Sequence, residues 1–434
     1  MEGRVVITGM GVVSPNAHGV DAFQKALKQG RSGIRFIPKL QELNFSCCIA
    51  GVPKDFEEIS HSYFSEKQNS RMSGSISYAS VAAIDAWKDA GLSLPVDDSP
   101  ADWETGAIVG CGIGDMELIA TTIVPVVNSG KVRKLGSRIV EQVMGSGISA
   151  RIAGLLGLGN QVTSNSSACS TGTEAIVEAF WRIRTGLAKR MIAGGAEGDS
   201  PYTWGGFDSM RVLSRKFNDQ PEKGSRPMSA TASGFVPGSG AGVIVLEDLQ
   251  TAIQRNARIY AEIIGGRVNC GGQRGGGSMT SPNSEGVQRC IRETIADADI
   301  SPNEIDAING HLTATFADPY EIMNWSKALG REPGCFPYIN STKSMIGHCL
   351  GGAGAIETVA ALIQLSEGFL HPSLNCEDLH PEIKAFSDHV VHTGMDYPEL
   401  KTMAKASFGF GDVNSCIILR KWDTNENHKG DING

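Results

Sequence analysis

Short apolar runs bounded by glycine alternate along this chain with longer segments whose apolar residues recur at helical spacing. Residues 106–110 and 190–195 are two such runs, typical of strands in a sheet that is covered on both faces. Residues 173–185 lie between them and predict a helix with one apolar stripe, formed by Ala175, Ile176, Ala179, Phe180 and Ile183. The order of strand, glycine turn, helix and strand indicates an α/β fold.

The start of the chain predicts elements of the same kinds. Residues 4–8 indicate a strand that runs into a glycine turn at residues 9–11 and then into a second apolar stretch that ends at Ser14. A helix is expected at residues 21–28, and the apolar spacing between residues 76 and 90 predicts a core-facing helix.

The pattern begins again near residue 251. Further strands are expected at residues 238–247, 259–268, 305–309 and 415–421, and further helices at residues 285–298 and 354–365. Two halves with a comparable order of elements suggest a duplicated α/β unit, with one half at residues 1–250 and the other at 251–421. The polar tail, residues 422–434, is expected to be disordered.

Composition and charge exclude several classes of function. The 434 residues include 53 glycines and carry a formal net charge of −8 with no long run of one sign, which gives no support to nucleic-acid or membrane-surface binding. The sequence has no bilayer-spanning apolar stretch and no signal-peptide pattern at its start. Its ten cysteines are scattered without a CxxC pair, so we expect neither a zinc site nor a disulfide framework. A cytoplasmic protein with reduced cysteines is predicted.

One cysteine has a distinctive position. Residues 165–174 are a run of small residues that leads directly into the helix predicted at 173–185. Cys169 is thereby placed on a tight turn at a helix N-terminus, where free amide N–H groups and the helix dipole favour the thiolate and lower the pKa of the thiol. A thiolate there is a nucleophile. The alternative is that Cys169 is one more buried structural cysteine.

A histidine follows the short strand predicted at residues 305–309. Ligands of α/β folds bind beyond the carboxyl ends of strands, so His311 is a candidate ligand-binding residue, and Thr313 and Thr315 are candidate hydroxyl donors. A histidine at a strand end that is merely hydrogen-bonded in the structure is the alternative.

Two more glycine-rich turns carry candidate chemistry. Residues 341–354 enter a helix and carry Lys343 and His348, with Glu357 further along. They lack the GxxxxGK[ST] spacing of a phosphate-binding loop, so nucleotide binding is not expected. Residues 406–414 form a tight turn before the last strand, and their glycines let backbone amides approach a ligand closely.

In this order, the four motifs resemble those of the elongating β-ketoacyl-acyl-carrier-protein synthases, which are condensing enzymes of the thiolase superfamily. The resemblance covers about residues 3–421, from the opening VVITGMGVVSP to the closing strand. It implies a five-layered αβαβα fold of two similar halves, acyl-carrier protein as the partner, and a homodimer, with a heterodimer as the alternative. No metal or diffusible cofactor is implied.

The resemblance also implies the reaction. Cys169 matches the nucleophile, which takes an acyl group from a carrier-protein thioester, and its backbone N–H and that of Phe408 match the oxyanion hole. His311 and His348 match the two histidines that bind the thioester carbonyl of malonyl-carrier protein, so that the enolate formed on loss of CO₂ is stabilised. That carbanion then attacks the acyl group on Cys169.

The remaining motif residues match supporting groups. Lys343 and Glu357 match an ion pair that organises the histidines, and Thr313 and Thr315 match hydroxyls that hold the pantetheine arm. Phe408 matches the residue that gates the acyl pocket, whereas Phe410 is expected to pack.

Basic residues are expected where the acidic carrier protein docks. Lys67 and Arg71 lie where members of the family carry basic docking residues, with ordinary solvated charge as the alternative.

The chain departs from the family pattern at three positions. Leu312 replaces a glycine beside the reacting centre, Phe316 stands where proline is usual, and Asp412 replaces the last glycine of the family's Phe-Gly-Gly. These departures motivate the hypothesis of a specialised synthase, serving a polyene or polyketide-type pathway rather than bulk fatty-acid synthesis.

Two other functions are alternatives. A non-catalytic partner subunit, similar to a chain-length factor, would lack the nucleophile that Cys169 supplies. A degradative thiolase would carry a second catalytic cysteine near the C-terminus, where this chain has residues 408–410, Phe-Gly-Phe.

Overall fold

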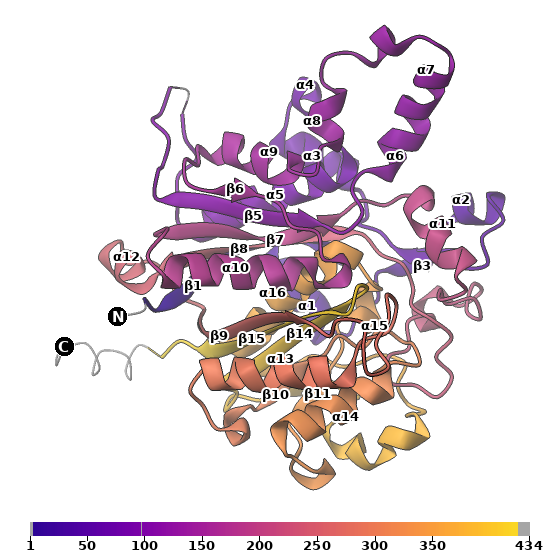
Figure 1. Ribbon diagram of the computed structural model, residues 1–434, viewed down its shortest axis with the longest axis vertical. Coiled ribbons are helices and arrows are strands. Elements are labelled where there is room, and N and C mark those ends of the chain that lie inside the picture. The colour runs from indigo at the N-terminus through magenta and orange to yellow at the C-terminus, as the bar shows by residue number, and fades with distance from the viewer. Residues whose placement is uncertain (1–2, 97, 424–434) are drawn as a thin grey trace.

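A mixed sheet of 11 strands runs through the molecule and consists of two half-sheets of five strands joined at one edge, with the short strand β2 (Ala17–His18) paired to the first strand (Figure 1). The computed structural model describes residues 3–96 and 98–423, so the tail predicted at 422–434 lies outside the described residues from residue 424 onward. The half-sheets join where residues 5–7 of the first strand pair antiparallel with residues 261–263.

The two half-sheets have the same strand order. The N-terminal half runs β6 (Val162–Thr163), β5 (Thr105–Cys111), β7 (Arg190–Glu197), β8 (Gly240–Asp248) and β1 (Val5–Ser14). The C-terminal half runs β11 (Tyr338–Asn340), β10 (Ala307–Asn309), β14 (Thr402–Gly409), β15 (Val413–Lys421) and β9 (Ala261–Cys270). In each half the first three strands of this order pair in parallel with one another. The fourth strand pairs antiparallel with both the third and the fifth.

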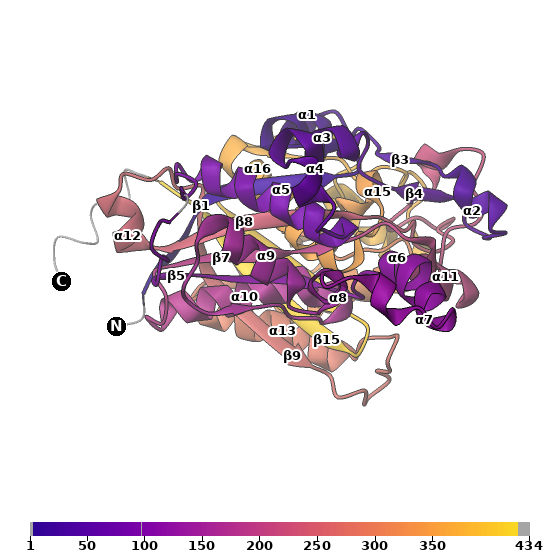
Figure 2. The same cartoon turned by 90° about the horizontal axis from the view of Figure 1, so that it is seen from above.

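Helices form three layers around the two half-sheets. Helices α10 (Thr171–Arg184) and α16 (Ala353–Glu367) lie between the half-sheets and pack on both (Figure 1). Helices α5 (Gly74–Asp89) and α9 (Gly147–Leu156) cover the outer face of the N-terminal half (Figure 2), and α13 (Ser284–Asp297) and α14 (Asp318–Leu329) cover that of the C-terminal half. The five-layered αβαβα fold predicted from the resemblance is confirmed.

The glycines predicted to form a turn at residues 9–11 instead lie inside one continuous strand, β1, so that prediction is wrong. Helix α5 crosses β1 so closely that a Cβ atom on Gly9 would lie 2.2 Å from the backbone oxygen of Ala86, and one on Gly11 would lie 1.9 Å from that of Ala82. Glycine is needed there because the helix backbone occupies the space of a side chain.

The other predicted helices and strands are present, with ends that shift by at most two residues. The remaining elements are short: β2 (Ala17–His18), α1 (Val20–Lys28), β3 (Ile34–Phe36), α2 (Pro38–Glu42), β4 (Ile49–Gly51), α3 (Phe56–Tyr63), α4 (Glu66–Asn69), α6 (Met116–Leu118), α7 (Val124–Asn128), α8 (Ile139–Val143), α11 (Pro201–Ser209), α12 (Leu249–Gln254), α15 (Lys343–Ile346), β12 (Phe369–Leu370) and β13 (Met395–Asp396). Among the described residues, no helix has the length and apolar character needed to cross a bilayer.

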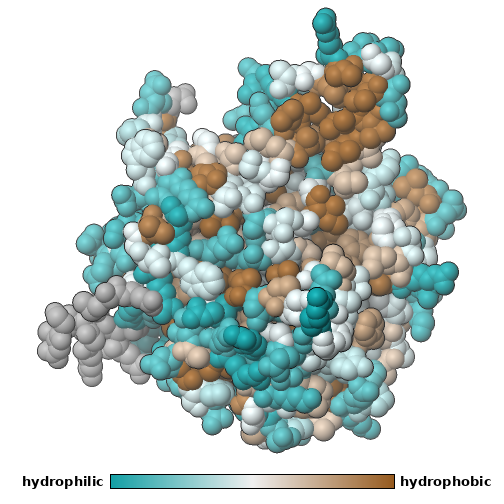
Figure 3. Space-filling view, viewed as in Figure 1, coloured by the Kyte–Doolittle hydropathy of each residue, from teal (hydrophilic) through white to brown (hydrophobic). Residues whose placement is uncertain are grey.

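One segment stands away from the layers. Helices α6, α7 and α8 project from the N-terminal half (Figure 1), and the space-filling view shows a large apolar patch on them (Figure 3). Val124, Val127, Val132 and Val140 are exposed there, with Val140 at 64%.

Candidate active site

The N-terminal ends of the two central helices meet in the middle of the molecule. A Cβ atom on Gly172 of α10 would lie 2.7 Å from a backbone nitrogen of α16, and one on Gly354 of α16 would lie 2.3 Å from Oγ1 of Thr173. Any side chain larger than hydrogen at either position would push the helices apart. The glycines therefore bring the turn before α10, which carries Cys169, close to the turn before α16, which carries His348.

Cys169 lies in a short 3-10 turn, Ala168–Ser170, that leads into α10, as the sequence predicts. The hydroxyl of Ser170 donates to the backbone oxygens of Ser407 at 3.1 Å and Val413 at 3.0 Å. These bonds fix the turn to strands β14 and β15, so residues from both halves of the chain hold the sulfur in place.

The backbone N–H that reaches the Cys169 sulfur belongs to Phe410. The family resemblance implied that the amide near the nucleophile belongs to Phe408 and that Phe410 only packs. The turn approaches this closely because Gly409 has no side chain: a Cβ atom there would lie 2.8 Å from the backbone oxygen of Ser167. The side chains of Phe408 and Phe410 both line the cavity described below.

The expected lowering of the pKa of Cys169 is contradicted. Burial raises the pKa of this thiol to about 11, and the opposing effects of the Lys343 ammonium and the Phe410 N–H are smaller. Charged Glu197 and Glu357 add to the increase. Cys169 is therefore a neutral thiol at pH 7 in the free protein, because removal from water penalises the anion more than the helix N-terminus and the nearby cation favour it.

His348 lies against the sulfur, with its Nε2 atom 3.1 Å from Sγ of Cys169. The backbone N–H of Leu350 donates to Nδ1 of His348 at 3.2 Å, so in the neutral ring the proton resides on Nε2 and points toward the sulfur. Burial lowers the pKa of His348 well below its usual range, and the ammonium groups of Lys343 and Lys405 act in the same direction. The ring is thus a neutral hydrogen-bond donor.

His311 lies beside His348, with 5.4 Å between the ring centroids and an angle of 83° between the rings. The carboxylate of Glu321 accepts the backbone N–H groups of His311 and Leu312, each at 2.7 Å, which fixes the loop after β10. The Lys343 ammonium donates to the backbone oxygen of His311 at 2.7 Å and approaches Nδ1 at 3.4 Å. The pKa of His311 is also lowered well below its usual range, with burial as the largest cause and the charge of Lys343 as the next.

A buried charge network lies behind the two histidines. Glu357 of α16 accepts a hydrogen bond from Lys343 and lies 2.9 Å from Nζ of Lys405. All three side chains are at most 1% exposed. The Lys343–Glu357 pair was expected from the sequence, but Lys405 was not. A lysine inside the otherwise apolar strand β14 was the available signal, because an unpaired charge is not stable in such a strand.

Glu197, at the end of strand β7, is a second buried acid that sequence reasoning missed. Its carboxylate accepts backbone N–H groups of Gly112 and Gly351, each at 3.0 Å, and the thiol of Cys111 at 3.2 Å. Burial raises the pKa of Glu197 to about 7, against the lowering effect of these hydrogen bonds. Glu197 thereby holds the turn before α16 in place below His348.

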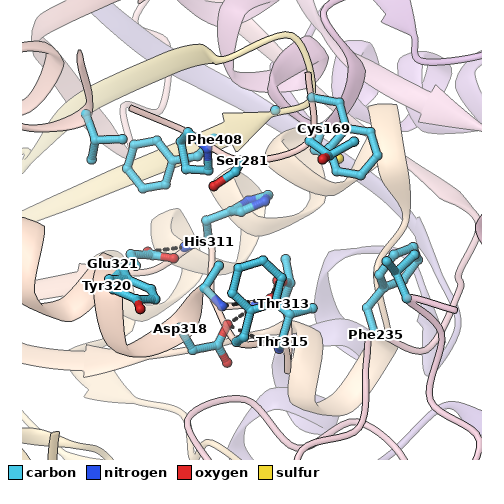
Figure 4. A pocket seen from close by; sticks show the side chains of 18 of the residues that line it. Cys169, Phe235, Ser281, His311, Thr313, Thr315, Asp318, Tyr320, Glu321 and Phe408 are labelled. Carbon is cyan, nitrogen blue, oxygen red and sulfur yellow. Dashed lines mark hydrogen bonds between the residues drawn. The ribbon is translucent and has the colours of Figure 1, made fainter. Parts of the chain in front are cut away.

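A cavity of about 430 Å³ leads to these groups. Cys169, His311 and His348 line it, and so do Thr313, Thr315 and Phe316. Figure 4 shows Cys169 and the Thr313–Thr315 pair at different ends of the cavity, with His311 between them. The two threonine hydroxyls lie 3.0 Å apart, and Phe316 is 73% exposed.

Three other predicted residues lie away from the cavity. Leu312 is 0% exposed and packs in the core of the C-terminal half, and it is not among the residues that line the cavity. Lys67 and Arg71 lie on and just after α4, beside α8 and α9, where Arg151 bonds to the backbone of Arg71. They do not line the cavity.

Within the described part of the chain, one group of side chains has the proximity to hold a metal ion: Cys169, His311 and His348, with ligand atoms all within 4.8 Å of one another. The chemistry of the group favours an anion instead. Two buried ammonium groups act on the histidines, and the thiol has a raised pKa, whereas a metal needs the thiolate. A polarised carbonyl oxygen suits two N–H donors backed by cations.

Comparisons with known proteins agree on one family. The model described as "Beta-ketoacyl synthase, N-terminal domain" matches residues 2–252, and that described as "Beta-ketoacyl synthase, C-terminal domain" matches residues 260–377. The chain is 36% identical over 419 residues to chloroplastic 3-oxoacyl-[acyl-carrier-protein] synthase I of Arabidopsis thaliana, which covers 96% of this chain and 86% of that protein. It is also 36% identical over 422 residues to 3-oxoacyl-[acyl-carrier-protein] synthase 2 of Vibrio harveyi, covering 96% of this chain and 98% of that protein.

Solved structures give the same result. A β-ketoacyl synthase from Burkholderia phymatum has a TM-score of 0.88 and 29% identity, covering 98% of this chain and 100% of that one. A ketosynthase in complex with a type II polyketide synthase acyl-carrier protein has a TM-score of 0.85 and 29% identity, with the same coverage.

Proposed function

The chain belongs to the β-ketoacyl synthase family and is a condensing acyltransferase, and from that membership we propose how its own residues carry out the reaction. An acyl group moves from acyl-carrier protein to Cys169 and is then condensed with malonyl-acyl-carrier protein to give β-ketoacyl-carrier protein and CO₂. The observation that carries this proposal is the 3.1 Å contact between His348 and Cys169, which both line the cavity.

In the first step, the Cys169 sulfur attacks the carbonyl carbon of the carrier thioester. The new S–C bond forms, the S–C bond to the carrier breaks, and the thiol proton passes to the departing carrier sulfur. Because the Phe410 N–H faces the sulfur, it and the N–H of Cys169 are placed to donate to the oxyanion of the tetrahedral intermediate. This pair replaces the one expected with Phe408.

In the second step, the two imidazoles bind the thioester oxygen of the malonyl group. The neutral His348 presents its Nε2–H because Leu350 occupies Nδ1, and His311 presents its Nε2–H because Lys343 approaches its Nδ1. Loss of CO₂ leaves its bonding electrons on an enolate whose oxygen accepts both N–H groups. The carbanion attacks the acyl carbon, the S–C bond to Cys169 breaks, and the sulfur regains a proton from solvent.

The carrier arm enters through the same cavity. Thr313 and Thr315, with hydroxyls 3.0 Å apart on the wall, hold the polar pantetheine arm. Lys67 and Arg71 dock the acidic carrier protein from the α4 surface. A structural neighbour bound to its acyl-carrier protein supports a carrier as the partner of this site.

The protein acts as a homodimer, with a heterodimer as the alternative. The exposed apolar patch on α6 to α8 supports this, because a second copy would cover it. The chain folds as two halves, residues 1–250 and 251–421, that share one reaction centre. Ten free cysteines support a reducing, cytoplasmic location.

The protein serves a specialised pathway rather than bulk fatty-acid synthesis. Phe316 in the cavity wall and Asp412 behind it support this, whereas Leu312, which lies in the core, no longer does. Equal rates of elongation for ordinary saturated and for unsaturated or aryl carriers would contradict it.

Intact mass after incubation with acyl-carrier protein tests the proposal. Wild type is expected to gain one acyl group and Cys169→Ala none, while Cys335→Ala, a control at an exposed cysteine that does not line the cavity, still gains it. A wild-type protein that stays unmodified by carriers of several acyl types would instead favour a non-catalytic partner subunit.

A further inference from the structure

Asp412 joins two segments of the cavity wall. Its Oδ1 accepts the backbone N–H of Asn283 at 2.7 Å, and its Oδ2 accepts that of Gln273 at 2.9 Å. Its backbone oxygen accepts the N–H of Gly271 at 2.9 Å. The residue is 1% exposed and has a φ of 64°, so a buried carboxylate binds both ends of the loop that consists of residues 271–283.

The loop is shaped around this carboxylate. A Cβ atom on Gly271 would lie 2.3 Å from Oδ2 of Asp412, and one on Gly277 would lie 2.6 Å from the same atom. Any other residue at these positions would displace the carboxylate or the loop. The two glycines and Asp412 thus form one fitted contact.

The residues that precede Asp412 connect the loop to the reacting centre. The backbone N–H of Gly411, next to Asp412, donates to the backbone oxygen of Met279 at 2.8 Å, and the N–H of Phe410 bonds with Cys169. On the other side, the loop contributes Gly275, Gly276, Thr280, Ser281 and Pro282 to the cavity wall. Movement of the loop would therefore change the space beside the nucleophile.

We propose that Asp412 is a specificity-determining positioning residue, which fixes loop 271–283 against the Phe410 turn and thereby restricts the acyl groups that Cys169 accepts. This inference rests on the proposed function for its substrate, but the fixing of the loop is independent of catalysis. The family's glycine at this position has no carboxylate with which to make the contact.

Asp412→Asn tests the contact with little change in volume. Its NH₂ group must face one of the two backbone N–H donors, so one hydrogen bond is lost and a repulsive pair replaces it. Gly277→Ala perturbs the same contact from the loop side. The control is Asp306→Asn, because one oxygen of Asp306 accepts two backbone N–H groups, from Lys401 and Thr402, so the asparagine oxygen can keep both bonds, and the residue does not line the cavity.

The first measurement is the rate of trypsin cleavage after Arg274, an exposed residue of the loop. We expect both test variants to be cleaved at least about tenfold faster than wild type, with no change in the control. The second is kcat/KM for acyl transfer to Cys169 across a series of acyl-chain lengths. The test variants are expected to lose selectivity, with the poorest wild-type substrates gaining relative to the best by about tenfold.

The outcomes separate the two proposals. Wild-type cleavage rates and an unchanged selectivity series in both test variants would overturn the role of Asp412. Faster trypsin cleavage together with an unchanged dependence of kcat/KM on acyl-chain length would overturn the role of Asp412 in specificity. If wild type accepted no acyl group at all, the proposed function would fail, while the cleavage rates would still report on the contact.

Discussion

The proton on Nε2 of His348 faces the sulfur of Cys169 across 3.1 Å, and the Leu350 N–H on the other ring nitrogen keeps it there. In the protein without substrate, His348 therefore donates a hydrogen bond to the sulfur and does not accept the proton of the thiol. In the proposed reaction, acyl transfer and decarboxylation therefore depend on different groups.

Replacing His348 with alanine is expected to leave acylation of Cys169 within about tenfold of wild type, but to lower malonyl decarboxylation and condensation by roughly 10²- to 10³-fold, the usual effect of removing one donor to a developing oxyanion. Intact mass measures the first step, and CO₂ release measures the second. Full condensation by His348→Ala would contradict the role of the ring. The acylation rate of the same variant is the control for folding.

The reactivity of Cys169 toward iodoacetamide is expected to rise with pH. Because burial raises the pKa of the thiol to about 11, the thiolate fraction grows about tenfold per pH unit between pH 7 and 9. Peptide mass spectrometry of Cys169 measures the alkylation rate, with exposed Cys270 as the reference for access of the reagent. A rate that stays constant over this range would mean that the thiolate is already formed.

Replacing Glu357 with glutamine is expected to lower the free energy of unfolding by roughly 3–5 kcal/mol, because the buried ammonium groups of Lys343 and Lys405 lose their counter-charge. Adding Lys405→Met to Glu357→Gln should recover part of this loss, since it removes one uncompensated charge. Urea denaturation of the two single variants and the double variant measures the coupling. Additive losses would show that the network is not electrostatically coupled.

Replacing Gly11 with alanine is expected to destabilise the protein by more than about 4 kcal/mol or prevent folding, because the new Cβ atom would lie 1.9 Å from the backbone oxygen of Ala82. Gly154→Ala is the control: the glycine lies in helix α9 with no atom near the new Cβ, and alanine there is expected to stabilise the helix by up to about 1 kcal/mol. Thermal unfolding compares the two. Equal melting temperatures would contradict the close crossing of α5 and β1.

Much of the fold could be predicted from the sequence, because local patterns report local structure. Apolar runs and helical spacing located the central helix α10 and the strands beside it, and the small residues before α10 placed Cys169 at its N-terminus. The glycines at residues 9 and 11 led to the wrong prediction of a turn. Glycine is needed there because a helix that lies more than 60 residues away in the chain packs against the strand. Glycine in a turn and glycine under a crossing helix leave the same local pattern.

The sequence by itself predicted which residues would carry the proposed chemistry: a cysteine on a tight turn, two histidines, and a lysine with its glutamate. Tertiary structure decided how they behave. The raised pKa of Cys169, the second lysine at Lys405 and the contact of Asp412 with its loop all arise from groups far apart in the chain. The tautomer of His348 arises from the way its ring folds onto the backbone N–H of Leu350. Desolvation and hydrogen bonding depend on what surrounds an atom in space, and a linear pattern does not contain that information.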